Sequence, residues 1–378
     1  MSFTELKLIK QLVISLDKKG YTSPTPIQQQ AIPYVLQGRD IFGCAQTGTG
    51  KTAAFALPVL QILHEKKESN KNNRNIKALI LAPTRELALQ ISESFLVYGH
   101  NLGLSHATVF GGVSQRSQTQ ALSRGVDILI ATPGRLLDLM NQGFVKLQDV
   151  QHFILDEADR MLDMGFINDI RKVITKLPAK KQTLFFSATA APDIMKLANN
   201  LLVNPVHISV TPVSTTATLV QQSVYYVNKE DKRSLLNHVL KNTGIEHAIV
   251  FTRTKRGADK VAKELNKTGV TAEAIHGNKS QGARERALKG FKNRSIRVLV
   301  ATDIASRGID IEKLSHVINY EIPEQAETYV HRIGRTGRAG ISGTALSFCA
   351  REEMSYMKDI SKLIKKNIDV VNSHPYSN

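Results

Sequence analysis

Short apolar runs alternate with amphipathic repeats along most of this chain. The uninterrupted apolar runs at Ala78–Leu81 and Ala248–Phe251 are typical of strands buried on both faces. Between such runs, apolar residues return at helical spacing, as they do over Arg85–Tyr98 and 255–266. The alternation predicts an α/β fold in which parallel sheets are covered by helices on both faces.

The first half of the chain contains further elements of both kinds. An amphipathic helix over 3–16, followed by Gly20, is expected to open the chain. The stretch 64–77 is rich in Lys and Asn, which predicts an exposed loop. We expect further strands at 41–44, 107–110, 127–130, 153–155 and 183–189, and further helices at 53–63, 114–122 and 167–177.

The alternation stops over 209–219, where Thr, Ser, Val and one proline show no periodic pattern. This composition predicts a linker between two domains, and a chain of 378 residues is long enough for two. The second half then repeats the pattern, with strands at 272–275 and 298–301 and a helix at 281–291. The expected domains are 1–208, which includes the segment 20–28, and 220–368, with a short polar tail at 369–378.

A glycine-rich segment, Ala45-Gln46-Thr47-Gly48-Thr49-Gly50-Lys51-Thr52, lies between an apolar run and an alanine-rich helix. This is the context that a phosphate-binding loop requires. The glycines let successive N–H groups face one anion at the helix N-terminus, while Lys51 adds a charge near the β- and γ-phosphates and Thr52 is the expected Mg²⁺ ligand. Ala45 stands where the usual pattern has glycine, and an ordinary Gly/Thr-rich turn is the alternative.

A pair of acidic residues follows the apolar run at 153–155. Asp156 is placed to hold Mg²⁺ directly or through water, and Glu157 is placed to orient or deprotonate an attacking water. An acidic strand end alone is common in α/β proteins. Its combination with Lys51 and Thr52, in the right order along the chain, favours a site that hydrolyses a nucleotide.

Two weaker features also fit a nucleotide. Gln28 offers both a donor and an acceptor to an adenine edge, and Tyr21 or Phe3 could stack on the base. A helix-initiating turn with a surface glutamine explains the same residues. The hydroxyls of Ser187 and Thr189, at the end of a buried run, are placed to hydrogen-bond the acidic segment and to sense the nucleotide.

Loops at the carboxyl ends of parallel strands hold the ligands in this class of fold. The loops at 83–87, 111–112 and 132–135 each combine exposed backbone or a helix start with a potential phosphate contact. Taken singly, each of them is more typical of an ordinary turn.

Three arginines recur at a spacing of three in the second domain, at Arg332, Arg335 and Arg338. The glycines between them disfavour a helix, which predicts an exposed row of positive charge suited to phosphates. Arginines delivered from a second domain act as fingers in phosphoryl transfer and contribute about 10³–10⁵ in rate. A solvated basic surface is the alternative.

The charge balance narrows the class of partner. Lys and Arg number 50 against 33 Asp and Glu, a formal net charge of +17, which favours a polyanion such as nucleic acid or an acidic lipid surface. No apolar run approaches the roughly 18 residues of a membrane span, and lysines interrupt any signal-peptide core near the N-terminus. The two cysteines, Cys44 and Cys349, lie far apart, as expected of free thiols in the cytoplasm.

Taken together, the motifs resemble those of the DEAD-box RNA helicases, in the family's own order and over nearly the whole chain. The matching segments are 20–28, 45–52, 83–87, 111–112, 132–135, 156–159, 187–189, 281–284, 301–310 and 331–338. The residues at 160–166 are most similar to the bacterial RhlE-type members. The resemblance implies two tandem RecA-like domains, each a parallel sheet covered by helices, with the nucleotide site in the interdomain cleft.

The resemblance also implies roles for single residues. The expected catalytic residues are Lys51, Glu157, Arg335 and Arg338. ATP and Mg²⁺ would be held by Tyr21, Gln28, Ala45, Gln46, Thr47, Gly48, Thr49, Gly50, Lys51, Thr52, Asp156 and Asp310, with Thr52 and Asp156 nearest the metal and Asp310 on the ribose. The RNA backbone would be contacted by Arg85, Gly112, Thr132, Arg135, Arg284 and Thr302.

The resulting prediction is an ATP-dependent RNA helicase, a monomer, that unwinds short duplexes or remodels ribonucleoprotein. An ATP-gated RNA clamp or assembly scaffold is the alternative, and Glu157, Arg335 and Arg338 favour turnover. A DNA translocase on the same fold would differ only in how it treats the 2′-OH, and the family resemblance favours RNA. The sequence names neither the physiological RNA nor protein partners.

Overall fold

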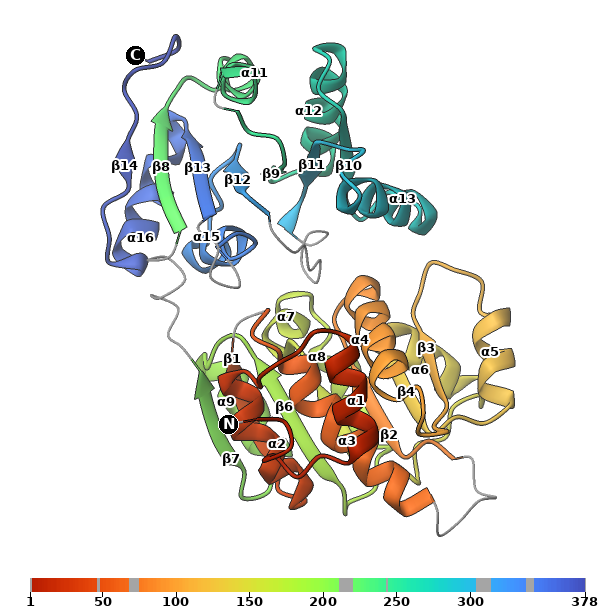
Figure 1. Ribbon diagram of the computed structural model, residues 1–378. Coiled ribbons are helices and arrows are strands. Elements are labelled where there is room, and N and C mark those ends of the chain that lie inside the picture. Colours follow the sequence, from red (N-terminus) through yellow and green to blue (C-terminus); the bar gives the residue numbers. More distant parts are fainter. Residues whose placement is uncertain are drawn as a thin grey trace. The chain divides into compact units, whose positions relative to one another are not determined.

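The computed structural model describes residues 2–45, 48–67, 75–210, 220–242, 244–303, 314–337 and 343–377. The chain divides into two compact units, Met1–Thr211 and Pro212–Asn378, which are described separately (Figure 1). Ser209 and Val210, the first two residues of the predicted linker, belong to a strand of the first unit. The rest of the predicted linker is the stretch 211–219, which lies outside the described residues.

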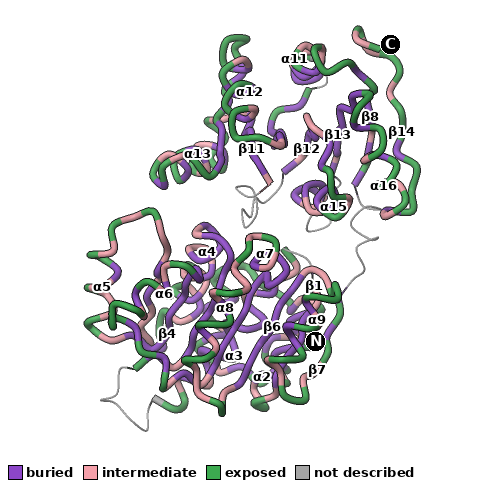
Figure 2. Tube along the Cα trace, turned by 180° about the vertical axis from the view of Figure 1, so that it is seen from behind, coloured by how far each residue is buried: buried purple, intermediate pink, exposed green. Residues whose placement is uncertain are grey.

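The first unit contains a parallel sheet with the strand order β3-β4-β2-β5-β6-β1-β7. Its inner strands β2, β4, β5 and β6 are buried at every residue, which explains why they appear in the sequence as apolar runs without alternation (Figure 2). The strands are β1 Ile41–Ala45, β2 Ala78–Leu81, β3 His106–Val109, β4 Ile128–Ala131, β5 His152–Leu155, β6 Gln182–Ser187 and β7 Val206–Val210.

Helices cover both faces of this sheet. Side chains of α1 to α4 share one apolar core with Ile80 and Leu184, and side chains of α6 to α9 share another with Leu79 and Phe185. Successive strand residues therefore enter opposite cores, as the two-residue period of a strand requires. The helices are α1 Lys10–Lys18, α2 Pro26–Leu36, α3 Lys51–Lys67, α4 Arg85–Tyr98, α5 Arg116–Ser123, α6 Pro133–Asn141, α7 Ala158–Asp163, α8 Ile167–Ile174 and α9 Pro192–Leu201.

The second unit repeats this architecture with the strand order β10-β11-β9-β12-β13-β8-β14. Its strands are β8 Val220–Tyr226, β9 Ala248–Phe251, β10 Ala272–Ile275, β11 Val298–Ala301, β12 His316–Asn319, β13 Gly343–Cys349 and β14 Asp369–Val370. Its helices are α11 Lys232–Asn242, α12 Lys255–Lys267, α13 Gln281–Lys292, α15 Ala326–Ile333 and α16 Met354–Ile364, with a 3₁₀ turn η1 at Arg351–Glu353. The predicted α/β class with parallel, helix-covered sheets is confirmed for both units.

The sequence analysis placed the start of the first helix too early. Residues 3–7 form turns, Lys7 takes a positive φ of 59°, and α1 begins only at Lys10. Phe3 and Leu6 are nevertheless buried in the core of the first unit. The spacing of these apolar residues therefore reflects their burial in the core and not a helical conformation.

Two predicted loop or tail segments contain regular structure. Helix α3 continues through Lys67, into the stretch predicted as an exposed loop. At the other end of the chain, β14 pairs with β8, the Val371 N–H donates to the Val224 carbonyl oxygen over 2.9 Å, and Tyr376 packs against the core. In the described part of the chain no helix is both long and apolar enough to cross a membrane.

We expect Gly43→Ala to destabilise the first unit. A Cβ at Gly43 would lie 2.6 Å from the ring of Phe186 on the neighbouring strand β6, and overpacking of a core costs about 1–3 kcal/mol. Urea unfolding followed by circular dichroism measures this loss. Gly134→Ala is the matched control, because its Cβ would meet no atom within 4 Å and should change the stability by no more than about 1 kcal/mol. Equal midpoints for the two variants would contradict the packing argument.

Candidate functional site

The candidate site segments of the first unit follow the carboxyl ends of three adjacent strands. The phosphate loop follows β1, Asp156 and Glu157 follow β5, and the segment 187–189 ends β6. In the sheet β6 pairs with both β1 and β5. The three segments therefore lie at one edge, although they are far apart in the sequence.

The described part of the phosphate loop has the expected backbone. Gly48 and Gly50 take φ values of 87° and 94°, which glycine adopts without steric cost. Helix α3 begins at Lys51, whose buried ammonium donates to the Ala45 carbonyl oxygen over 2.7 Å. Thr52, the expected metal ligand, is partly exposed beside it. The lysine is thus held between the end of β1 and the start of a helix, as a phosphate cradle requires.

Lys51 and Asp156 form the electrostatic centre of this edge. Burial lowers the pKa of Lys51, and the nearby carboxylates of Asp156 and Asp159 oppose that change. Burial raises the pKa of Asp156, and Lys51 and Arg160 oppose that change. Each buried charge therefore depends on the other for its stability.

Asp156 also satisfies a simple test for a divalent cation. Its side chain is 2% exposed, and among the described residues its Oδ1 atom has no hydrogen-bond partner. Mg²⁺ prefers oxygen ligands and is usually held by one or two carboxylates together with phosphate oxygens and water. A buried, unpartnered carboxylate oxygen beside a phosphate loop fits that ion.

Glu157 has a left-handed backbone conformation, with φ 56° and ψ 52°, just before α7 begins. Such a conformation costs a non-glycine residue about 1–2 kcal/mol, and residues of this kind cluster at active sites. Its carboxylate forms an ion pair with Arg160, which is also buried. Arg160 was missed by the sequence analysis, although opposite charges three residues apart at a helix start are a recognisable signal.

The acidic segment is joined to the end of β6 by a backbone contact. Asp159 accepts hydrogen bonds from the Ala188 N–H over 3.1 Å and the Arg160 N–H over 3.0 Å. The predicted link used the hydroxyls of Ser187 and Thr189, and the structure instead places the Ser187 hydroxyl as acceptor from the Thr189 N–H over 3.3 Å. Asp159, like Arg160, was given no role in the sequence analysis.

The candidate adenine residues divide into two groups. Gln28 is buried, so it is not the surface glutamine of the alternative prediction: its Oε1 accepts from the Thr25 N–H over 3.0 Å and its Nε2 donates to the Gly50 carbonyl oxygen over 3.1 Å. Tyr21 is 48% exposed and is accessible to a base, whereas Phe3 is 5% exposed and is excluded as a stacking partner. The structure thus ties Gln28 directly to the phosphate loop.

The predicted RNA-contacting residues of the first unit gather at the ends of β2, β4 and β3, which are neighbours in the sheet. Arg85 begins α4, and its guanidinium lies so close to Gly112 that a Cβ there would overlap it. Thr132 is buried just before α6, and Arg135 donates from Nη2 to the Val113 carbonyl oxygen over 3.2 Å. Three loops that sequence analysis treated separately therefore form one cluster.

Arg332 corrects the prediction of an exposed row of arginines. Its side chain is 1% exposed, and it donates from Nε to Asp303 Oδ1 over 2.6 Å and from Nη2 to Oδ2 over 2.8 Å. A third bond reaches the Glu321 carbonyl oxygen over 2.6 Å, and the guanidinium lies 5.0 Å from the ring centre of Phe251. Arg332 is therefore a packed residue of the second unit, and Arg335 is buried as well, at 6% exposed.

The remaining site residues of the second unit lie at the same edge of its sheet or outside the described residues. Arg284 on α13 and Thr302 after β11 are both buried. Thr302 precedes Asp303, which links it to the arginine segment through Arg332. The predicted residues that lie outside the described part of the chain are Gln46, Thr47, Asp310 and Arg338.

These features define a class of protein. A parallel sheet whose first strand leads into a phosphate loop and a helix, with a buried aspartate on a nearby strand end, is the arrangement of P-loop nucleotide hydrolases. Two family models match the chain: DEAD/DEAH box helicase over residues 25–197, and Helicase conserved C-terminal domain over residues 231–340.

Named relatives make the family plain. DEAD-box ATP-dependent RNA helicase CshA of Streptococcus pneumoniae is 44% identical over 368 residues, which cover 97% of this chain and 69% of the relative. ATP-dependent RNA helicase CshA of Listeria monocytogenes is 42% identical over 366 residues, 97% and 69% of the two chains. This chain belongs to the DEAD-box ATP-dependent RNA helicases. The relatives named here are CshA proteins, so the RhlE-type subgroup stays a prediction.

Solved structures share the fold. S. cerevisiae Dbp5 bound to RNA and ADP BeF3 matches with a TM-score of 0.86 at 30% identity, over 98% of this chain and 95% of that chain. Mss116p bound to ssRNA and AMP-PNP matches with a TM-score of 0.88 at 28% identity, over 99% and 79%. The prediction of tandem RecA-like domains is confirmed.

Arg332→Ala should destabilise the second unit and not merely slow turnover. Removing one partner of a buried ion pair costs about 3–5 kcal/mol, and the lower value is expected because Asp303 is 24% exposed. Urea unfolding measures the loss. The control Arg256→Ala, on the exposed surface of α12, should change stability by less than about 0.5 kcal/mol. Parental stability of Arg332→Ala, together with lost turnover, would restore the exposed-row prediction.

Proposed function

We propose that this ATP-dependent RNA helicase binds ATP on the first unit through Lys51 and the phosphate loop and hydrolyses it with Glu157 as general base. The observation that carries the proposal is the buried pair of Lys51 and Asp156, with Glu157 in a left-handed conformation beside it. Lys51 binds the β- and γ-phosphates, and the phosphate-loop N–H groups at the start of α3 add the helix dipole.

Asp156 and Thr52 are the proposed ligands of Mg²⁺. Mg²⁺ held by these two residues would neutralise negative charge that develops on the phosphates during transfer. A cation beside Asp156 would also offset the cost of burying its charged carboxylate, as the positive charge of Lys51 does here. This reasoning rests on the unpartnered Oδ1 atom of Asp156.

Glu157 must exchange its ion pair with Arg160 for a water molecule before it can accept a proton. We therefore propose that nucleotide and RNA together shift Arg160, and that the contact from Asp159 to the Ala188 N–H transmits that shift to the end of β6. Tyr21 and Gln28 would hold adenine, and Arg335, Arg338 and Asp310 of the second unit would complete hydrolysis. On this proposal turnover needs groups from both units.

RNA is proposed to bind through its sugar-phosphate backbone. Arg85, Gly112, Thr132 and Arg135 form the cluster of the first unit, and Arg284 and Thr302 are the candidates of the second. The Nη1 atom of Arg135 is buried and, among the described residues, has no hydrogen-bond partner, which favours an incoming phosphate oxygen. Contacts of this kind carry no base sequence information.

RNA-dependent turnover tests the proposed function. The ATPase rate is measured without nucleic acid, with single-stranded RNA, and with single-stranded DNA of the same sequence. We expect strong stimulation by RNA alone. Equal rates with and without RNA would contradict coupling between the units, and equal stimulation by DNA would contradict recognition of RNA.

A monomeric state and a cytoplasmic location also stay predictions. Sedimentation tests the monomeric state.

Glu157→Gln should retain ATP and RNA binding while losing turnover by about 10²-fold or more, because the amide keeps the shape and loses the base. In ATP it should therefore hold RNA longer than the parent does, which a chase with unlabelled RNA measures. Glu93→Gln, on the exposed surface of α4, is the matched control and should behave like the parent. Parental RNA release by Glu157→Gln would remove the role given to Glu157.

Arg135→Ala should weaken RNA binding about equally for unrelated sequences. The slope of log affinity against log salt should become shallower by about 0.7, the value for one phosphate contact on a single strand. Arg124→Ala removes an exposed arginine of the same unit and should leave the slope unchanged. A sequence-dependent loss, or the same slope change in both variants, would contradict a local phosphate contact at Arg135.

A further inference from the structure

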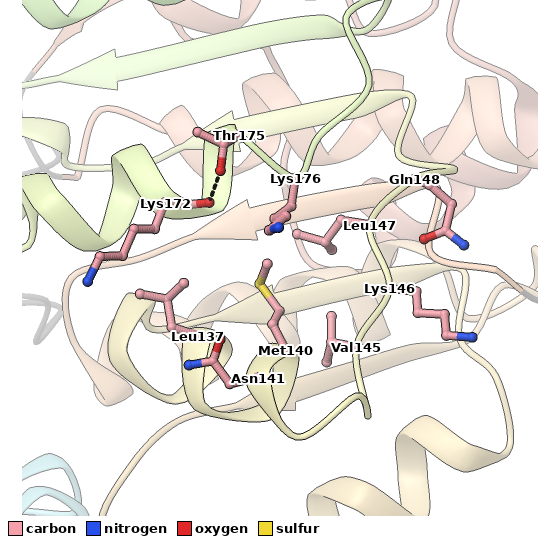
Figure 3. A pocket seen from close by; sticks show the side chains of 10 residues that line it. All are labelled: Leu137, Met140, Asn141, Val145, Lys146, Leu147, Gln148, Lys172, Thr175 and Lys176. Carbon is pink, nitrogen blue, oxygen red and sulfur yellow. Dashed lines mark hydrogen bonds between the residues drawn. The ribbon is translucent and has the colours of Figure 1, made fainter.

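A cavity of about 520 Å³ lies in the first unit between the C-terminal turns of α6 and α8 and the loop at 144–148 (Figure 3). Its volume is within the range of about 300–1,000 Å³ that ligand sites occupy. Aliphatic and thioether side chains form its apolar part, namely Leu137, Met140, Val145 and Leu147. Val145 and Leu147 are buried, whereas Leu137 and Met140 are partly exposed to the cavity.

This cavity is separate from the nucleotide and RNA residues of the same unit. Helix α6 begins at Pro133, beside the RNA cluster, and the cavity uses its last turns. The loop at 144–148 leads to the start of β5 at His152, whereas Asp156 follows the other end of that strand. The cavity therefore lies toward the amino edge of the sheet, opposite the catalytic edge.

Three lysines surround the apolar part of the cavity, Lys146, Lys172 and Lys176 (Figure 3). All three are exposed, and in the described part of the chain none of their ammonium groups has a carboxylate within ion-pair distance. By contrast, Lys77 and Arg135 of the same unit do have carboxylate partners. No Asp or Glu is among the residues that line the cavity.

The lining favours a peptide over RNA as the occupant. A nucleobase held in an apolar cavity would stack on aromatic side chains, and none of the ten lining residues is aromatic, so the apolar part of this cavity has no stacking surface for a base. Met140 and the aliphatic side chains suit an apolar side chain, because methionine adapts to irregular shapes. Asn141 and Gln148 add neutral donors and acceptors for a peptide backbone.

We propose that this cavity docks a short acidic segment of a partner protein, which inserts a large apolar side chain between α6 and α8 and pairs its carboxylates with Lys146, Lys172 and Lys176. Charge complementarity selects the occupant, since the rim carries three positive charges and no negative one. The proposal goes beyond ATP and RNA binding, because it gives the amino edge of the sheet a role in recruiting another protein.

A fluorescent ten-residue peptide that alternates Glu with Leu and contains one Phe is the probe, and anisotropy measures its affinity for the full chain. A second peptide with Ser at every Leu and Phe position tests the apolar contribution. The pocket variant combines Lys146→Gln, Lys172→Gln and Lys176→Gln. The control variant combines Lys10→Gln, Lys18→Gln and Lys19→Gln, which removes the same charge from exposed positions around α1.

We expect saturable binding of the first peptide to the parent, weakened about tenfold or more in the pocket variant and less than about twofold in the control. Thr175→Trp, which places a ring in the cavity from the exposed end of α8, should weaken binding as well. RNA-stimulated ATP turnover should stay at the parental rate in all variants, because the changed residues are far from the catalytic edge.

Five outcomes overturn the proposal. The first peptide fails to bind the parent at about 1 mM; both triple variants lose affinity equally, which indicates diffuse charge; or the Ser-containing peptide binds as well as the first, which removes the apolar cavity from the interaction. The fourth is a loss of RNA affinity in the pocket variant that equals or exceeds its loss of peptide affinity, which would assign the cavity to RNA. The fifth is a loss of self-association in the pocket variant, which would assign the cavity to a second copy of the chain.

Discussion

Lys51 and Asp156 are both buried, and the electrostatic effect of each on the other is the constraint on which the carboxyl edge of the first sheet depends. Taking either charge out of water alone costs several kcal/mol. Burial acts against the charged form of each side chain, and the opposite charge of the other acts against that effect. The pair in turn requires β1 and β5 to end at the same edge, with β6 between them. A phosphate loop placed elsewhere in the sheet would take from each of these two buried charges the opposite charge of the other.

Each unit uses an aspartate carboxylate to join separate segments at the carboxyl edge of its sheet. In the first unit, Asp159 accepts from the Ala188 N–H and joins α7 to the end of β6. In the second, Asp303 receives two bonds from Arg332 and joins the end of β11 to α15. Such contacts hold the joined segments in a fixed arrangement, because charged hydrogen bonds inside a protein are strong and directional.

The two edges of the first sheet are built for different chemistry. The carboxyl edge collects glycines, buried acids and arginines, among them Arg85 beside Gly112 and Arg135, which donates to the Val113 carbonyl oxygen. The amino edge carries three lysines around an aliphatic cavity, and within the described part of the chain none of them has a carboxylate partner. Parallel strands make this division possible, since all of their carboxyl ends face one way and insertions at the opposite ends leave the catalytic loops unchanged.

The local sequence pattern was enough to predict the helices and strands. It did not predict which residues pair with buried charges. The helix over Arg85–Tyr98 and the strand over Ala78–Leu81 follow from spacing and apolar runs, since these depend on neighbours in the chain. The burial of Arg332 depends on Asp303, 29 residues earlier, and three evenly spaced arginines look exposed until that partner is known. Strand order decides which distant charges meet, because burying a charge is stable only where folding supplies its opposite.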